Sequence, residues 1–110
     1  MAKEKPDLIK GTLDMLILKT LSLEPMHGWG IQERILEMSG ELLRVQQGSL
    51  YASLHRLTRE GWIKSYWGKT PHNRRARYYA LTKPGRKQLG IENDHWQRLS
   101  DGVTRVMATS

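Results

Sequence analysis

The sequence has 110 residues and a net charge of +7, with 38% hydrophobic residues, 26% charged residues and no cysteine. Its length suits one domain with an adequate core, and its composition is that of neither a disordered nor a membrane protein. The absence of cysteine excludes disulfides, thiolate metal sites and cysteine nucleophiles, and the polar residues 1–7 predict no secretory signal, so we expect a soluble cytoplasmic protein.

The first predicted helix lies within residues 8–23 and is mostly buried. Leu13, Ile17 and Leu21 follow the helical repeat, and Thr12 is its expected N-cap. This pattern places one face of the helix in the core.

A second helix is predicted over residues 28–38, where Ile31 and Ile35 are one turn apart. Gly40 is expected to end it, as a glycine after a helix commonly does. The short segment 41–45 that follows has enough apolar residues for one brief strand.

The third predicted helix runs from residue 47 to about residue 60. Leu50, Leu54 and Leu57 recur at helical spacing, so they are expected to face the core. The opposite arc, expected to be exposed, has short side chains near its start and arginines near its end: Ser49, Ala52, Ser53, Arg56 and Arg59.

A β-hairpin is predicted next. Residues 62–68 and 77–81 have the alternation and the aromatic content of strands. Residues 69–75, which join them, are basic and rich in turn-forming residues. We therefore expect two antiparallel strands with a charged tip.

The final predicted helix starts at Thr82, its expected N-cap, with Pro84 in the first turn. Its apolar residues step by seven, three, four and three positions: Leu89, Trp96, Leu99, Val103 and Val106. This is the spacing of a coiled-coil seam. The seam has no obvious partner within the chain, so the helix is predicted to pair with a second copy.

The order of these elements predicts the fold class. Three helices followed by a two-stranded hairpin are the winged-helix form of the helix-turn-helix. The expected class is mainly α (α+β), with a winged-helix DNA-binding domain over residues 1–81 and a C-terminal dimerisation helix over residues 82–110.

The positive charge is concentrated in the middle of the chain, from residue 44 to residue 87. Residues 44–87 contain eleven lysines and arginines and a single acid, Glu60, whereas both flanking segments carry a small net negative charge. A basic block of this kind is typical of a surface that binds phosphates. The alternative is a solvated face with an accidental bias. An anionic membrane surface is disfavoured, because the block is not one basic amphipathic helix.

The third helix and the hairpin tip supply the candidate contacts to double-stranded DNA. Short side chains would let the helix approach base edges, and Arg56 could reach a guanine or a phosphate. A basic hairpin tip can enter the minor groove or clamp its phosphates. The candidate residues are Gln47, Ser49, Ser53, Arg56, Lys69, Asn73, Arg74, Arg75 and Arg77. The alternative is an ordinary amphipathic helix followed by a solvated turn.

Other kinds of site find little support in the sequence. The four histidines occur singly, so no metal site and no cofactor are expected. No arrangement of residues predicts an enzyme. The aromatic residues of the hairpin are interpreted as packing and cross-strand pairs. Trp96 is different, because it lies on the predicted dimer seam, where it is either an interface aromatic or a platform for a flat aromatic ligand.

Six segments together resemble the PadR family of bacterial transcriptional regulators. They are Leu8–Leu18, Met26–Ile31, Gln47–Leu57, Gly61–Ile63, Arg74–Thr82 and Gly85–Arg86. The resemblance runs from about residue 8 to residue 106, and the chain is similar to the short subfamily with one C-terminal helix. Trp29 stands where the family usually has tyrosine, and Ala52 stands where proline is common.

The resemblance implies a homodimer that binds operator DNA through the winged helix. It implies DNA contact by Gln47, Ser49, Tyr51 and Arg56 and by the wing, with Tyr51 as a phosphate contact. It also implies a small aromatic effector as a candidate ligand, with Trp96 at the place of an interfacial drug pocket in some members.

Three functions are therefore weighed. The first is a homodimeric repressor that binds a near-palindromic operator. The second is an architectural protein that binds nucleic acid without sequence preference. The third is a winged helix that binds other proteins and no nucleic acid.

Overall fold

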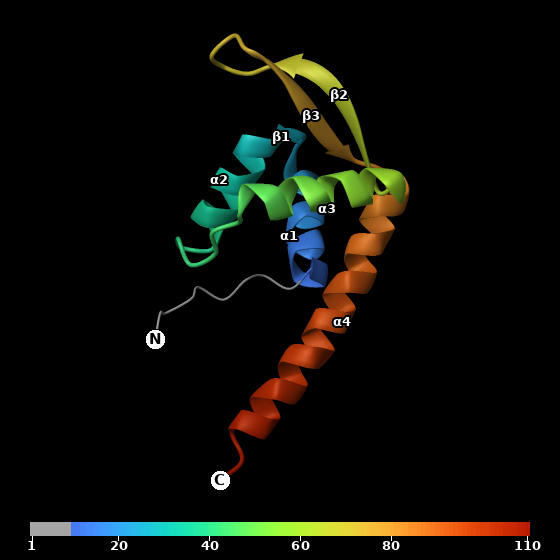
Figure 1. Ribbon diagram of the computed structural model, residues 1–110. Coiled ribbons are helices and arrows are strands. Elements are labelled where there is room, and N and C mark those ends of the chain that lie inside the picture. The colour runs from blue at the N-terminus through green and yellow to red at the C-terminus, as the bar shows by residue number, and fades with distance from the viewer. Residues whose placement is uncertain (1–9) are drawn as a thin grey trace.

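The structure, a computed structural model, describes residues 10–110 and has the predicted winged-helix architecture (Figure 1). Its elements in chain order are α1 (Lys10–Leu23), β1 (Met26–His27), α2 (Gly28–Met38), α3 (Gln47–Arg59), β2 (Ile63–Lys69), β3 (Arg75–Leu81) and α4 (Lys83–Met107). Over these residues the fold is α+β, with four helices and one small antiparallel sheet of strand order β1-β3-β2.

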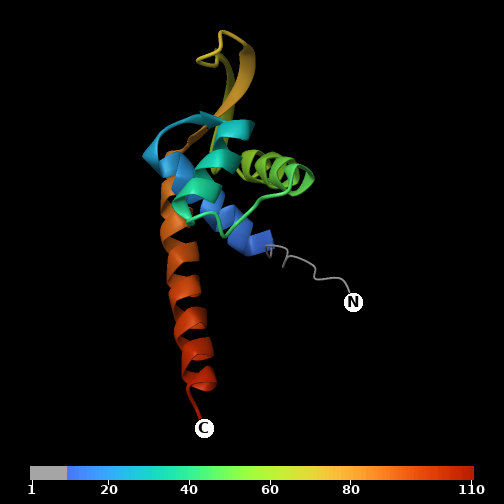
Figure 2. The same cartoon turned by 90° about the vertical axis from the view of Figure 1, so that its left-hand side faces the viewer.

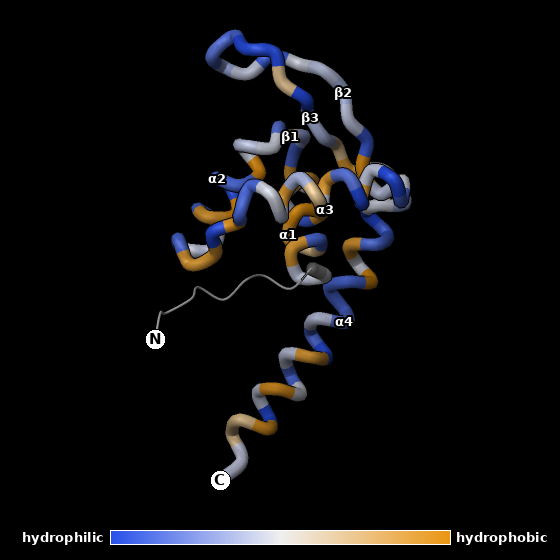
Figure 3. Tube along the Cα trace, viewed as in Figure 1, coloured by the Kyte–Doolittle hydropathy of each residue, from blue (hydrophilic) through white to orange (hydrophobic). Residues whose placement is uncertain are grey.

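The core lies where α1, α2 and α3 meet the base of the sheet, and the apolar positions expected from helical spacing are buried there. The fully or nearly fully buried side chains are Leu13, Ile17, Leu18, Leu21, Ile31, Ile35, Leu50, Leu54, Leu57 and Ile63. Hydrophobic segments accordingly gather around α1 in the centre of the molecule (Figure 3). The burial of these side chains is the main stabilising term of the fold.

The structure corrects the expected start of the first helix. Because α1 already includes Lys10 and Gly11, Thr12 lies inside its first turn and is not the N-cap. The cap position lies outside the described residues.

The structure also corrects the brief strand expected over residues 41–45, which form no strand. Gly40 and Glu41 both have a positive φ of 66°, which reverses the chain after α2. Gly40 therefore follows the end of α2 as predicted, and the chain then runs irregularly to α3.

Strand β1 was not expected. Met26 and His27 pair with Tyr79 and Tyr78 of β3, so the hairpin gains a third, very short strand. The His27 side chain also caps α2, because its Nδ1 atom accepts a hydrogen bond from the backbone N–H of Gly30 at 3.1 Å. This connection fixes the start of α2 against the base of the wing.

The long helix α4 begins as predicted at Thr82, whose Oγ1 accepts a hydrogen bond from the backbone N–H of Gly85 at 3.0 Å. A Cβ atom at Gly85 would collide with the carbonyl oxygen of Trp62, so the first turn of α4 packs directly on the backbone before β2.

With 25 residues, α4 is about 37 Å long. Its first half packs on α1, and the remainder extends away from the winged helix (Figures 1 and 2). The tip of the wing and the end of α4 lie at opposite ends of a molecule that measures 56 × 37 × 21 Å.

Candidate nucleic-acid interface

The outer face of α3 is exposed along its whole length, while its leucines are buried. The exposed residues are Gln47, Gly48, Ser49, Tyr51, Ala52, His55, Thr58 and Arg59. The first half of this face carries mostly short side chains, as expected from the sequence. A helix with such a face can approach another surface closely with its backbone.

Ser53 does not belong to this face, and the expectation that it is exposed is wrong. Its side chain is only 3% exposed, because it points toward α1, where its hydroxyl accepts a hydrogen bond from Arg56 at 3.2 Å. Ser53 is therefore not part of the exposed face of α3.

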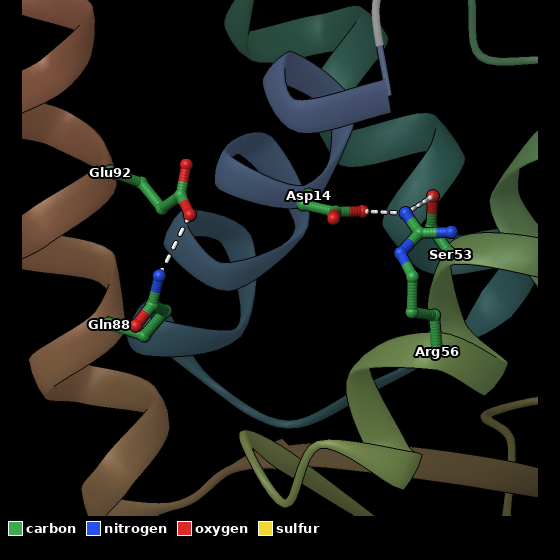
Figure 4. Close-up of polar contacts among 5 residues, drawn as sticks. All are labelled: Asp14, Ser53, Arg56, Gln88 and Glu92. Atoms are coloured by element: carbon green, nitrogen blue, oxygen red, sulfur yellow. Dashed lines mark hydrogen bonds and ion pairs between the residues drawn. The ribbon is translucent and has the colours of Figure 1, made fainter.

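Arg56 is also turned toward the protein. Its guanidinium donates to the carboxylate of Asp14 on α1 (Figure 4), and both side chains are largely buried. No sequence pattern indicated this ion pair, because Asp14 and Arg56 are 42 positions apart. Arg56 therefore ties α3 to α1 in this structure.

The wing is formed by β2, β3 and their connection. Its basic residues Lys69, Arg74, Arg75 and Arg77 are exposed, as is Asn73 at the tip. Asn73 has a positive φ of 62°, a conformation that asparagine tolerates better than most residues. The turn is closed by a hydrogen bond from the Thr70 N–H to the Arg74 carbonyl at 2.8 Å, so the basic residues are carried by an ordered hairpin.

The two arginines of β3 share one aromatic neighbour. The guanidinium carbons of Arg75 and Arg77 lie 4.4 Å and 4.7 Å from the ring centroid of Trp67. Trp67 was interpreted as hairpin packing, and here it packs on cations rather than in the core, with 53% of its surface exposed.

The wing and the helices border an open groove of about 870 Å³. Its lining includes Tyr51 of α3, Trp29 of α2, and Arg75 and Arg77 of the wing. The Tyr51 hydroxyl lies so close to Gly28 that a Cβ atom there would collide with it.

Tyr79 lies at the base of the same groove. Burial raises the pKa of its phenol, and the neighbouring Tyr51 raises it further, while Arg77 lowers it. The Tyr79 phenol therefore adds no negative charge to the groove, whose charged lining residues are Glu33 of α2 and Arg74, Arg75 and Arg77 of the wing.

Two residues of this surface were not among the predicted contacts. His55 lies in the middle of the exposed face of α3, one turn from both Tyr51 and Arg59. Trp29 is 59% exposed at the start of α2. The spacing of His55 was visible in the sequence, whereas the exposure of Trp29 depends on how α2 packs.

Only part of the predicted apolar seam of α4 is exposed, because its first residue packs on the core. Leu89 packs against the protein's own core, which corrects its assignment to an unpartnered face. Beyond it, Trp96, Leu99, Val103 and Val106 are exposed by 40 to 71%. Apolar bands continue along this part of α4, which projects away from the winged helix (Figure 3).

Residues 10–110 hold no cluster of three or more potential metal-ligating side chains. Among the helices that the structure describes, none is both long and apolar enough to cross a membrane.

Comparison with known proteins identifies relatives along most of the chain. The model of the "Transcriptional regulator PadR-like family" matches residues 17–91. Uncharacterized protein X of Lysinibacillus sphaericus is 25% identical over 103 residues, which are 94% of each chain.

Solved structures resemble the whole fold. A transcriptional regulator from Clostridium thermocellum is 29% identical, with a TM-score of 0.78 over 91% of this chain and 93% of that one. A PadR family transcriptional regulator from Eggerthella lenta is 28% identical, with a TM-score of 0.77 over 92% of this chain and 86% of that one.

Proposed function

The chain belongs to the PadR-like family of transcriptional regulators, and we propose that it is a homodimeric repressor that binds a near-palindromic operator in double-stranded DNA. A protein with this role binds DNA and catalyses no reaction. It acts in the cytoplasm, where the bacterial chromosome lies.

The observation that carries this proposal is the groove between α3 and the wing. Tyr51 of the exposed face of α3 and the arginines of the wing line the same groove, so one duplex can contact both elements. Because Glu60 is the only acid within residues 44–87, the attraction to a polyanion is opposed by few like charges.

Different residues make different contacts in this proposal. Gln47 and Ser49 at the start of α3 approach base edges in the major groove, and Tyr51 contacts a phosphate. In the wing, the contacts to the DNA backbone come from Lys69, Asn73, Arg74, Arg75 and Arg77. Ser53 takes no part, because it is buried.

Arg56 acts indirectly, because its pairing with Asp14 keeps α3 at a fixed angle to α1. In this way it orients the recognition helix, and its guanidinium does not itself read a base.

The dimer contact is assigned to the exposed half of α4. Trp96, Leu99, Val103 and Val106 form an apolar stripe on a helix end that projects away from the winged helix. A second copy of α4 would bury this stripe, and the winged helices over residues 1–81 would then be related by a two-fold axis. Two recognition helices about one DNA turn apart read a near-palindromic site.

A small aromatic effector is proposed to bind beside Trp96 at this interface, where flat rings can stack on the indole. It releases DNA only if it binds the DNA-incompetent form of the dimer more tightly than the DNA-bound form. Quenching of tryptophan fluorescence in the wild type, absent in Trp96→Ala, would support this site. Equal quenching in both proteins would contradict it.

The experiment that tests the function is competition between a candidate operator and random duplex DNA. A specific regulator should prefer its operator by roughly a thousandfold or more at physiological salt. Equal affinity for all duplexes would favour the architectural alternative. The absence of salt-dependent duplex binding would favour a winged helix that binds other proteins.

A further inference from the structure

We propose that Trp67 is a positioning residue of the wing, whose indole ring holds the guanidinium groups of Arg75 and Arg77 ready to contact the DNA backbone together. This inference rests on the proposed function. It gives a role to a half-exposed tryptophan that lies outside the core and is not among the proposed DNA contacts.

The register of the hairpin brings these three side chains to one face. Trp67 of β2 is paired directly with Arg77 of β3. Arg75 lies two residues before Arg77, so its side chain points to the same side of the sheet and reaches the ring diagonally. The ring-to-guanidinium distances of 4.4 Å and 4.7 Å are those of two cation–π contacts.

This arrangement leaves the arginines able to bind phosphate. A guanidinium group stacks with its flat face, whereas its five N–H donors point outward in the plane of the group. The two guanidinium carbons lie over the Trp67 ring, and a group held there by its flat face keeps its N–H edges available to phosphate oxygens. Arg77 donates one hydrogen bond to the hydroxyl of Ser65 at 2.9 Å, which restricts it further.

Trp67 also offsets the electrostatic repulsion between the two arginines. Arg75 and Arg77 are like charges on neighbouring positions of one face, and both line the groove that is proposed to receive DNA. The negative face of an aromatic ring attracts both cations, which offsets their mutual repulsion before DNA binds. Without the ring, the two side chains would have to be ordered at the moment of binding, which weakens affinity.

The test compares duplex binding by the wild type, Trp67→Ala, Trp67→Phe and Tyr66→Ala at one salt concentration. Tyr66 is the matched control, because it is a half-exposed aromatic on the opposite face of the same strand. We expect Trp67→Ala to bind about tenfold more weakly, since two arginines lose their ordered positions. Trp67→Phe should restore most of the affinity, and Tyr66→Ala should bind like the wild type.

A second measurement separates positioning from a general weakening of the hairpin. In an Arg75→Ala/Arg77→Ala background, Trp67→Ala should cause no further loss, because the groups that it positions are gone. If Trp67→Ala fails to fold, Trp67→Leu keeps an apolar side chain at this place but has no ring, and the same loss is expected of it.

The outcomes distinguish this inference from the proposed function. If the wild type shows no salt-dependent duplex binding, the proposed function itself is wrong. If the wild type binds and Trp67→Ala binds equally well, Trp67 does not position the arginines. An equal loss in Tyr66→Ala, or a further loss in the double-arginine background, would also overturn the inference.

Discussion

Asp14 of α1 and Arg56 of α3 form an ion pair that joins the first helix to the recognition helix (Figure 4). The same Arg56 guanidinium donates to Ser53, so one side chain links two residues of α3 to α1. Figure 4 also shows α4 on the other side of α1, where Gln88 donates to Glu92 at 2.8 Å. Helix α1 thus lies between the helix that is proposed to read DNA and the helix that is proposed to dimerise.

We expect Asp14→Ala to lower the free energy of unfolding by about 2 kcal/mol, because it leaves a largely buried guanidinium without its charged partner. Urea unfolding measures this loss.

Arg56→Ala should reduce the affinity for DNA without changing the slope of its salt dependence, since Arg56 is not assigned to a phosphate. A slope smaller by about one unit would instead make Arg56 a phosphate contact.

Arg75→Ala should weaken binding to all duplexes to a similar extent and reduce the salt slope by about one unit, because one phosphate contact is lost. Titrations of operator and random duplex over a range of salt concentrations measure both effects. An unchanged slope would remove Arg75 from the phosphate contacts.

Two glycines of α4 should respond in opposite ways to alanine. Gly85→Ala should cost more than about 2 kcal/mol, because the new Cβ atom collides with the Trp62 backbone. Gly90→Ala meets nothing within 4 Å and should stabilise the helix by up to about 1 kcal/mol. Thermal unfolding of both variants checks this contrast, and equal effects would mean that the first turn of α4 does not pack on Trp62.

Leu99→Asp should convert the proposed dimer to a monomer, because a carboxylate in an apolar helix pair is strongly disfavoured. Thr104→Asp is the matched control, since Thr104 is exposed on the same helix but off the apolar stripe. Analytical ultracentrifugation should show a monomer for the first variant and a dimer for the second. A wild type that sediments as a monomer would exclude the α4 interface.

Local patterns were sufficient to predict most of the fold. The leucine spacing of α3 identified its buried face, and Thr82 was identified as the cap of α4 because a cap depends only on its own few residues. The basic character of the wing was likewise visible in the sequence, because the charge of a hairpin tip follows from its own residues and does not depend on contacts with distant segments.

Three of the errors concern contacts between distant segments, whereas the cap at Thr12 and the strand over residues 41–45 were local predictions that the structure corrects. Strand β1 has only two residues, too few for any periodicity, and it forms because β3 lies beside it. Ser53 and Arg56 are on the polar side of α3, but α1 covers that edge and supplies Asp14. Leu89 fits the seam by spacing, yet the first half of α4 packs on α1.

The most direct test of the central claim is selection of genomic fragments from the source organism by the purified protein at physiological salt. We expect enrichment of one short, near-palindromic site, bound at least roughly a thousandfold more tightly than random duplex. Fragments that bind without enrichment of any sequence would contradict the claim that this protein is an operator-specific regulator.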